Sequence, residues 1–271
     1  MLSEAADGVL VHTSAWCRTN AVVVVGDTGV LVVDPGIHES EIGCLADDLQ
    51  RAGHTVVAGF ATHPHWDHLL WHPALGAVDQ WATALAADTA RRRLANGIDA
   101  KRFGIPDDVR LDGLGDDLAG LPAGADRIPW DGPTVRILEH RAHAPGHAAL
   151  LVDGAGVLVA GDMLSDVFVP MLDLAGAPDP LDDYLAALFL LEAQAGEATV
   201  VIPGHGSVGD ATALRDRLAR DRAYVEALVD GYEPHDARVE SPRAGWEFVR
   251  SVHDRQLDQL SIPRSAAGDG A

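Results

Sequence analysis

The sequence has few of the features that mark disulfide-rich or membrane-bound proteins. Only two of its 271 residues are cysteines, Cys17 and Cys44, and they form no C-x-x-C pair. Neither a disulfide framework nor a thiolate zinc site is therefore indicated. No stretch approaches the roughly 18 apolar residues of a membrane span. The first residues lack the basic region and long apolar run of a signal peptide. We therefore expect a cytoplasmic protein with no membrane partner.

Positive charge is also scarce. Lys101 is the only lysine, and the formal net charge is −21. An acidic surface repels phosphate backbones and anionic lipid heads, which argues against nucleic acid or a membrane as a partner. The arginine run at 91–93 fits a solvated helix face. A small-molecule substrate is the remaining expectation, and the sequence predicts no oligomeric state.

What the sequence does contain is typical of a globular domain. Apolar residues make up 47% and charged residues 23% of the chain, which is close to average usage. We expect a single domain over residues 1–262. A helical insertion at about 77–133, C-terminal helices at about 210–260 and a disordered tail at 263–271 complete the predicted organisation.

Apolar runs and glycine-rich turns place the secondary structure. Runs rich in Val, Ile and Leu predict strands at 22–25, 30–33, 55–62, 134–140, 148–154, 156–162 and 198–206. Helical spacing predicts helices at 39–51, 77–95, 182–194, 210–231 and 244–260. The first two strands form a hairpin through Gly26–Gly29. Both are apolar on both faces, so they should be covered on both sides.

The order of these elements favours an α+β fold in which two mixed β-sheets pack together with helices on the outside, an αββα sandwich. A doubly wound parallel sheet is the alternative. The two predicted hairpins argue against it.

The stretch HPHWDH at 63–68 is the most informative motif. Four polar side chains follow a buried strand, and without a shared partner they would carry large desolvation costs. His63 and His65 lie on the same side of an extended backbone, because side chains alternate. Asp67 and His68 follow a bend toward a helix that should begin near 68. This loop can therefore contribute ligands to two metal ions about 3.5–4 Å apart.

Three later residues are further candidate ligands, because each lies at the end of a predicted strand and next to a glycine. They are His147 in PGH, Asp162 in GD and His205 in PGHG. Glycine lets the backbone approach a crowded centre closely. His147 is the least certain of the three, because His140 and His143 are near it in sequence. Imidazole and carboxylate donors without thiolate favour two Zn²⁺ ions, and Mn²⁺ or Fe²⁺ accepts the same donors.

These motifs resemble those of the metallo-β-lactamase fold superfamily. HPHWDH matches its H-x-H-x-D-H signature, and PGH, GD and PGHG follow in its order. The match runs from about Asn20 to Gly206. The resemblance implies His63, His65 and His147 as ligands of a first ion, and Asp67, His68 and His205 as ligands of a second. It implies that Asp162 bridges both ions and that Asp34, in VVDPG, orients a ligand.

The resemblance and the ligand set together predict a dinuclear zinc-type hydrolase, with Asp67 and Asp162 as catalytic residues. A hydroxide shared by the two ions would attack a carboxylic ester-type bond of a small molecule, in a lactone, thioester or ester. Such a lactonase or thioesterase differs from a true β-lactamase, because family members with a bridging aspartate are typically not β-lactamases. The alternatives are a small-molecule phosphodiesterase, a β-lactam hydrolase on the same site, or a non-catalytic metal-binding relative. Trp66, Trp71, Trp81 and Trp130 are candidate walls of the substrate pocket.

Overall fold

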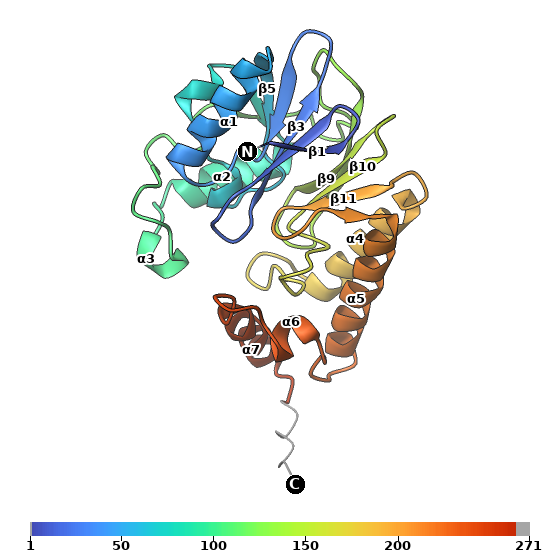
Figure 1. The fold of residues 1–271 in the computed structure, drawn as a ribbon. Coiled ribbons are helices and arrows are strands. Elements are labelled where there is room, and N and C mark those ends of the chain that lie inside the picture. The colour runs from blue at the N-terminus through green and yellow to red at the C-terminus, as the bar shows by residue number, and fades with distance from the viewer. Residues whose placement is uncertain (1, 264–271) are drawn as a thin grey trace.

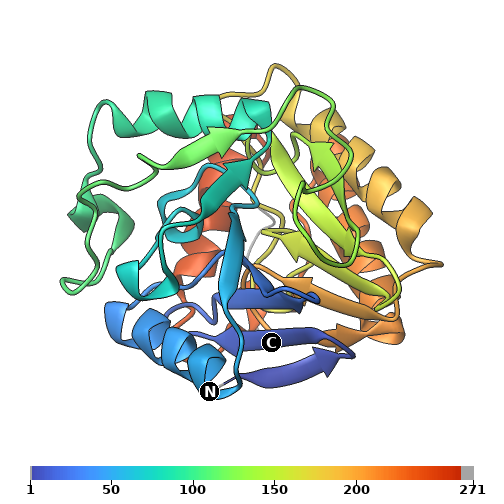
Figure 2. The ribbon, with the colours of Figure 1, turned by 90° about the horizontal axis from the view of Figure 1, so that it is seen from above.

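Two mixed β-sheets lie face to face, and helices cover their outer faces (Figures 1 and 2). This arrangement is seen in a computed structural model that describes residues 2–263. It has the layers of the predicted αββα sandwich.

The first sheet has seven strands in sequence order. They are β1 (Ser3–Ala6), β2 (Val9–Thr13), β3 (Asn20–Val25), β4 (Val30–Val33), β5 (Val56–Phe60), β6 (Asp79–Ala82) and β7 (Leu118–Gly120). Strands β1 to β4 pair antiparallel, and β4 to β7 pair parallel. The predicted hairpin is β3–β4, closed by a hydrogen bond from the N–H of Gly26 to the carbonyl of Gly29.

The second sheet has five strands in the order β12-β11-β10-β9-β8. They are β8 (Val135–His140), β9 (His147–Val152), β10 (Val157–Gly161), β11 (Val200–Pro203) and β12 (Gly209–Asp210). Only β10 and β11 pair parallel, so this sheet is mixed as well.

The helices flank both sheets. They are α1 (Glu39–Arg51), α2 (Ala84–Leu94), α3 (Ala100–Phe103), α4 (Pro180–Gln194), α5 (Ala211–Val229), α6 (Ala237–Glu240) and α7 (Phe248–Leu260). In Figure 1, α1 and α2 lie outside the first sheet and α4 and α5 outside the second, while α6 and α7 lie below the sheets. No helix of residues 2–263 is long and apolar enough to cross a membrane.

The sandwich explains why β3 and β4 are apolar on both faces. Val22 and Val24 face the core between the two sheets, while Val23 faces the core beneath α1 and α2. A third core lies between the second sheet and the C-terminal helices, and it contains the buried Tyr184 of α4. Residues of one strand therefore alternate between two apolar layers rather than between core and solvent.

The predicted helix at 77–95 is wrong in its first part. Residues 79–82 form β6, which pairs with β5 on one side and β7 on the other. The helix begins only after Thr83, whose hydroxyl accepts a hydrogen bond from the N–H of Ala86 and caps the helix. Residues 77–133 thus supply two strands of the sheet, and the only α-helices among them are α2 and α3.

The sequence analysis did not predict strands β1, β2 and β12. The other predicted strands and helices agree with the structure to within a few residues, with two exceptions. No α-helix begins near 68; residues Trp66–His68 form one short 3₁₀ turn instead. The C-terminal helix begins at Phe248 rather than at 244, with α6 before it. Residues 264–271 of the predicted disordered tail lie outside the described residues.

Candidate metal centre

The loop after β5 brings its polar residues to one place. Strand β5 ends at Phe60, and the chain turns at Trp66–His68. The buried side chains of His63, Asp67 and His68 meet residues from beyond β8, β10 and β11. The two sheets therefore deliver chemical groups from four segments of the chain to the same edge of the sandwich.

The first cluster, called here the three-histidine group, contains His63, His65, His143 and Asp162. One ligand atom of each lies within 4.8 Å of the others. His63 Nε2 and His143 Nε2 lie 3.1 Å and 3.0 Å from His65 Nδ1. Asp162 Oδ2 lies 3.4 Å from His143 Nε2 and 3.7 Å from His63 Nε2.

In His143 and His63, hydrogen bonds made by Nδ1 leave Nε2 as the nitrogen that faces this group. A backbone carbonyl can only accept, so His143 Nδ1–H donates to the carbonyl of Met171 at 2.9 Å. His63 Nδ1 lies 3.0 Å from the hydroxyl of Thr62. That hydroxyl donates to Asp34, so it accepts from His63. Both Nε2 atoms then present lone pairs to the same point, which is the arrangement a bound cation requires.

The second cluster, the Asp67 group, contains Asp67, His68 and His205, whose ligand atoms also lie within 4.8 Å of one another. Asp67 Oδ2 lies 3.2 Å from His205 Nε2 and 3.6 Å from His68 Nε2. His205 Nδ1–H donates to the carbonyl of Cys17 at 3.0 Å, which turns Nε2 toward the group.

Asp162 lies between the two clusters. Its Oδ1 is 3.2 Å from His68 Nε2, and its Oδ2 is 3.5 Å from His205 Nε2 as well as near the three-histidine group. A carboxylate in this position has one oxygen for each side. Asp162 thus lies close to histidines of both clusters, and the bridging role that the resemblance implies for it stays a prediction.

Asp34 orients His68, as the sequence predicts. The buried carboxylate accepts hydrogen bonds from the backbone N–H and the hydroxyl of Thr62, at 2.9 and 2.7 Å. It also accepts the Nδ1–H of His68 at 2.9 Å. These bonds fix the His68 ring with Nε2 facing Asp67 and Asp162.

The first cluster contains His143 and not His147, which the resemblance implies as a ligand of the first ion. Both ring nitrogens of His147 have protein partners: Nε2 accepts the backbone N–H of Asp162 at 3.0 Å, and Nδ1 donates to His140 at 3.1 Å. In the structure His147 therefore supports the backbone of Asp162. His143 lies in the loop before β9, and its ring reaches the site that the sequence assigned to His147.

Two glycines allow these close approaches. A Cβ atom on Gly161 would lie 2.4 Å from His147 Nε2, and one on Gly204 would lie 2.2 Å from Asp162 Oδ1. Gly161 also has a positive φ of 53°, which residues with a side chain rarely adopt. Strands β10 and β11 can therefore end against the site only where no side chain is present.

Burial and charge set the protonation states of the site. Burial, with the neighbouring His68, holds the pKa of His63 well below its usual range. Burial and His143 lower the pKa of His65 to about 3. These rings are neutral at neutral pH, which is the form that binds metal.

The pKa values of the two histidines beside the carboxylates, His205 and His68, are raised instead. Burial opposes charge on His205, but Asp162 and Asp67 outweigh it and raise the pKa of His205 to about 9. Asp162, Asp67 and Asp34 outweigh burial at His68 and hold its pKa well above the usual range. Both shifts show a site whose negative charge requires a positive one.

The residues present fit the binding of divalent metal. His68 Nε2 and Asp162 Oδ1 are buried 3.2 Å apart, and neither has a hydrogen-bond partner. Buried polar atoms of this kind are costly unless something pairs them. Imidazole nitrogens and carboxylate oxygens are the donors that zinc and similar ions accept.

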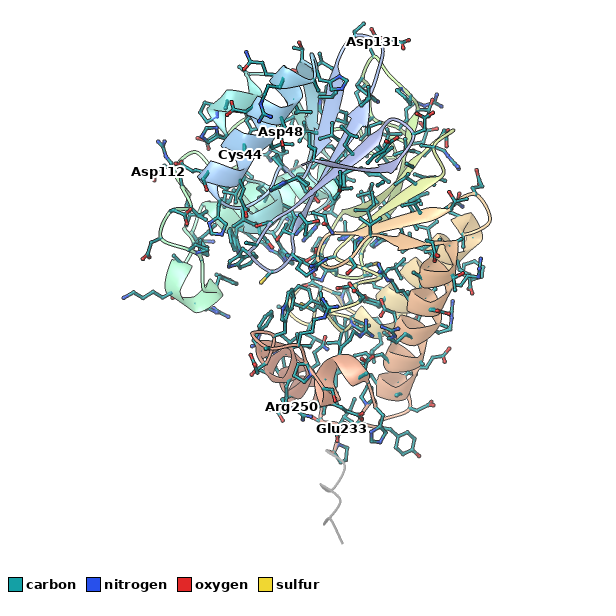
Figure 3. All side chains as sticks on the ribbon, in the orientation of Figure 1. Cys44, Asp48, Asp112, Asp131, Glu233 and Arg250 are labelled. Atoms are coloured by element: carbon teal, nitrogen blue, oxygen red, sulfur yellow. The ribbon has the colours of Figure 1, made fainter. Side chains whose placement is uncertain are left out.

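The cysteines supply no thiolate to this centre. Cys17 lies beside it, and burial, together with Asp67 and Asp162, raises the pKa of its thiol to about 12. A neutral thiol is a poor ligand and a poor nucleophile. Cys44 lies exposed on α1 (Figure 3), and both cysteines are free.

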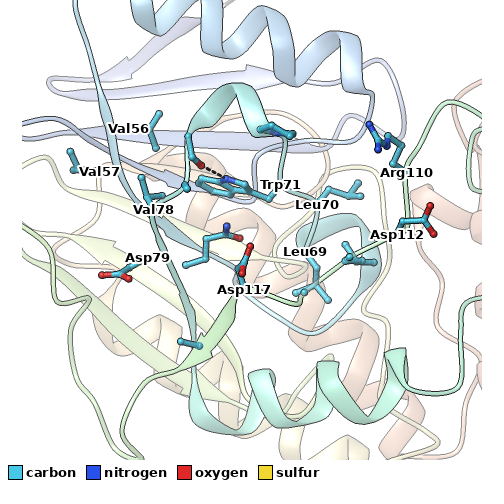
Figure 4. Close-up of a pocket in the computed structure, with 18 residues that line it drawn as sticks. Val56, Val57, Leu69, Leu70, Trp71, Val78, Asp79, Arg110, Asp112 and Asp117 are labelled. Carbon is cyan, nitrogen blue, oxygen red and sulfur yellow. Dashed lines mark hydrogen bonds between the residues drawn. The ribbon is translucent and has the colours of Figure 1, made fainter.

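A cavity of about 940 Å³ lies away from the metal centre, between α1 and α2 (Figure 4). It is lined by β5, β6 and the segment at 110–119, and Trp71 lies within it with its indole N–H donating to the carbonyl of Gly76. None of the seven clustered residues lines it. Trp71 therefore belongs to this cavity, and of the four predicted tryptophan walls only Trp66 lies in the loop that holds the centre.

Trp81 and Trp130 pack against the core between the sheets. The aromatic neighbours of the centre that the sequence did not reveal are Trp16, beside Trp66, and Phe168, beside His205.

Comparison with known proteins agrees with this geometry. The sequence profile of the metallo-beta-lactamase superfamily matches residues 14–205. The chain therefore belongs to that superfamily, and its two mixed sheets with flanking helices are the superfamily's fold. None of the curated proteins compared with the chain matches it significantly.

Solved structures share the fold at low sequence identity. A beta-lactamase domain protein from Burkholderia ambifaria superposes with a TM-score of 0.60 at 23% identity, over 85% of this chain and 76% of that one. A metallo-beta-lactamase from Pontibacter korlensis gives 0.59 at 18% identity, over 81% and 97%. One from Hirschia baltica gives 0.57 at 18% identity, over 81% and 96%. At this identity the likeness concerns the fold alone.

Proposed function

We propose that this protein is a hydrolase that uses two divalent cations to cleave a carboxylic ester-type bond of a small molecule, in a lactone, thioester or ester. One observation carries the proposal: ligand atoms of seven side chains form two adjacent groups, and Asp162 reaches both. Zn²⁺ is the favoured ion. The proposed ligands are His63, His65, His143, Asp67, His68, His205 and Asp162.

The cations would supply the electrophilic part of the chemistry, because they lower the pKa of a water and polarise a carbonyl oxygen. The chain's own residues hold the proposed ligands in place and orient their rings. Asp34, Thr62 and the carbonyls of Cys17 and Met171 fix the ring orientations of four histidines. His147 holds the backbone of Asp162.

The carboxylate of Asp67 faces His205 and His68 in the Asp67 group. Burial raises the pKa of this carboxyl, but His68 and His205 outweigh burial and bring the pKa below its usual value. The carboxylate is therefore ionised at neutral pH. We propose that it accepts a proton from the attacking water, in addition to its role as a ligand.

The charge of the chain favours a carboxylic ester over a phosphodiester. A net charge of −21 repels polyanions, whereas lactones and esters are neutral at the reacting group. A small phosphodiester and a β-lactam are the competing substrates, and a metal-binding protein without activity is the competing class.

A substrate panel separates these possibilities. The zinc-loaded protein is assayed against a lactone, a thioester, an ester, a β-lactam and bis-p-nitrophenyl phosphate. We expect hydrolysis of at least one carboxylic ester class, and a loss of several orders of magnitude in turnover in Asp162→Ala and His65→Ala. Circular dichroism checks that both variants fold, and Asp153→Ala, at an exposed carboxylate of the same sheet, is the control. Hydrolysis of the phosphodiester or β-lactam alone, or unchanged activity in either variant, would contradict the proposal.

A further inference from the structure

Aromatic side chains surround the ring of His205. The ring centroid of Phe168 lies 4.9 Å from that of His205, and the centroid of Trp16 lies 6.2 Å from it. Trp16 in turn meets Trp66 edge to face, at 5.1 Å. The second cluster of ligands is therefore bordered by apolar surface as well as by polar groups.

The C-terminal segment extends this surface. Trp246 and Phe248 lie 5.2 and 5.5 Å from Phe168, centroid to centroid, and their rings are nearly parallel to each other at 27°. Phe168 is 8% exposed, whereas Phe248 is 40% exposed. These three residues, called here the aromatic cluster, are in successive ring contact from the side of His205 to the partly exposed Phe248.

Arg238 of α6 fastens the C-terminal segment to the loop that holds Phe168. Its buried guanidinium donates to the carbonyls of Ser165 and Phe168, at 3.0 and 2.7 Å. It also donates to the carboxylates of Asp221 and Asp236, each at 2.7 Å. A buried charge with this many partners holds its neighbours in one arrangement.

Helix α7 contacts the same loop at a second place. Gln256 accepts the N–H of Leu172 at 2.8 Å and donates to the carbonyl of Pro170 at 3.0 Å. Between them lies Met171, whose carbonyl orients His143. The C-terminal helices thus support both the aromatic cluster and a proposed metal ligand, so the cluster is a built part of the site.

We propose that the aromatic cluster binds a bulky apolar acyl group of the substrate, with the acyl carbonyl at the metal centre. The inference rests on the proposed function and narrows its substrate class to esters, thioesters or lactones with a long or aromatic acyl part. A half-exposed phenylalanine and a tryptophan beside a polar centre leave apolar area in water, and an apolar ligand group removes that area.

Binding of straight-chain carboxylates tests the subsite without requiring turnover. Calorimetry of the zinc-loaded protein measures Kd for butanoate, hexanoate, octanoate and decanoate. Each methylene that reaches the cluster should tighten Kd about fourfold, which corresponds to about 0.8 kcal/mol. A Kd that does not change with chain length would overturn the proposal.

Three variants assign the effect to the cluster. Phe248→Ala and Trp246→Ala should each flatten the dependence on chain length, while Phe189→Ala, at an exposed phenylalanine of α4, should leave it intact. Should Trp246→Ala fail to fold, the half-exposed Phe248 still decides the question. An unchanged dependence in Phe248→Ala would show that the cluster only packs.

The two proposals can fail separately. Hydrolysis of short acyl esters reports on the proposed function, and the chain-length dependence of binding reports on the subsite. A chain-length dependence without hydrolysis would retain the subsite and remove the hydrolase. Hydrolysis without a chain-length dependence of binding would retain the hydrolase and remove the subsite.

Discussion

Asp34→Asn is expected to weaken metal binding although Asp34 contacts no proposed ion. Asparagine has the shape of aspartate and tolerates the positive φ of 49° at this position. Its amide oxygen can still accept the N–H of Thr62. Its NH₂ group, however, would face the His68 Nδ1–H that the carboxylate accepts at 2.9 Å in the structure.

Two donors cannot share one hydrogen bond, so the His68 ring would have to carry its proton on Nε2 instead. Nε2 is the atom that faces Asp162 Oδ1 at 3.2 Å, where the cation is proposed to bind. Loss of an orienting partner of this kind typically lowers metal affinity 10- to 100-fold, which is about 1.4–2.8 kcal/mol.

Competition with a chromophoric chelator measures the affinities of the two ions, and the weaker binding should affect the ion of the Asp67 group. Urea unfolding of the metal-free proteins provides a check on stability. Asp27→Asn, the same change in the exposed turn before β4, is the control and should bind both ions as the wild type does. Wild-type affinity for both ions in Asp34→Asn would refute the reasoning.

Four further substitutions test other parts of the account. His143→Ala should reduce the tightly bound metal from two ions to one, whereas His147→Ala should retain both ions with a lower turnover. Atomic emission measures the bound metal. Equal metal loss in the two variants would contradict the proposal that His143, and not His147, is a metal ligand. Arg238→Met leaves two buried carboxylates without their partner and should lower the free energy of unfolding by about 3–5 kcal/mol, and urea titration showing less than about 1 kcal/mol would argue against a buried ion network. Gly161→Ala places a Cβ against His147 and should cost about 1–3 kcal/mol through overpacking, with activity falling as well; a neutral effect on both would mean that the approach of β10 to the site is not tight.

The sequence predicted the features that depend on local pattern. The motif at 63–68, the aspartate at 34 and the glycine beside Asp162 each lie at a strand end, where chemistry and backbone geometry can be inferred from neighbouring residues. The apolar strands β3 and β4 likewise indicated a sheet covered on both sides.

The features that the sequence did not indicate arise from contacts between distant segments. His147 follows Pro-Gly and begins a strand, which makes it the obvious candidate, but the ring of His143 is oriented by the carbonyl of Met171, 28 residues away. Residues 79–82 form a strand because β7 pairs with them from about 40 residues further along. The aromatic neighbours of His205, Trp16 and Phe168, lie far from it in the sequence, and nothing local marks them.

The most direct test is anomalous scattering from crystals of the zinc-loaded protein, recorded at the zinc absorption edge. The account predicts two peaks per chain, one inside the three-histidine group and one inside the Asp67 group, with Asp162 within about 2.0–2.2 Å of both. A single peak bonded to His147, or no peak in either group, would contradict it.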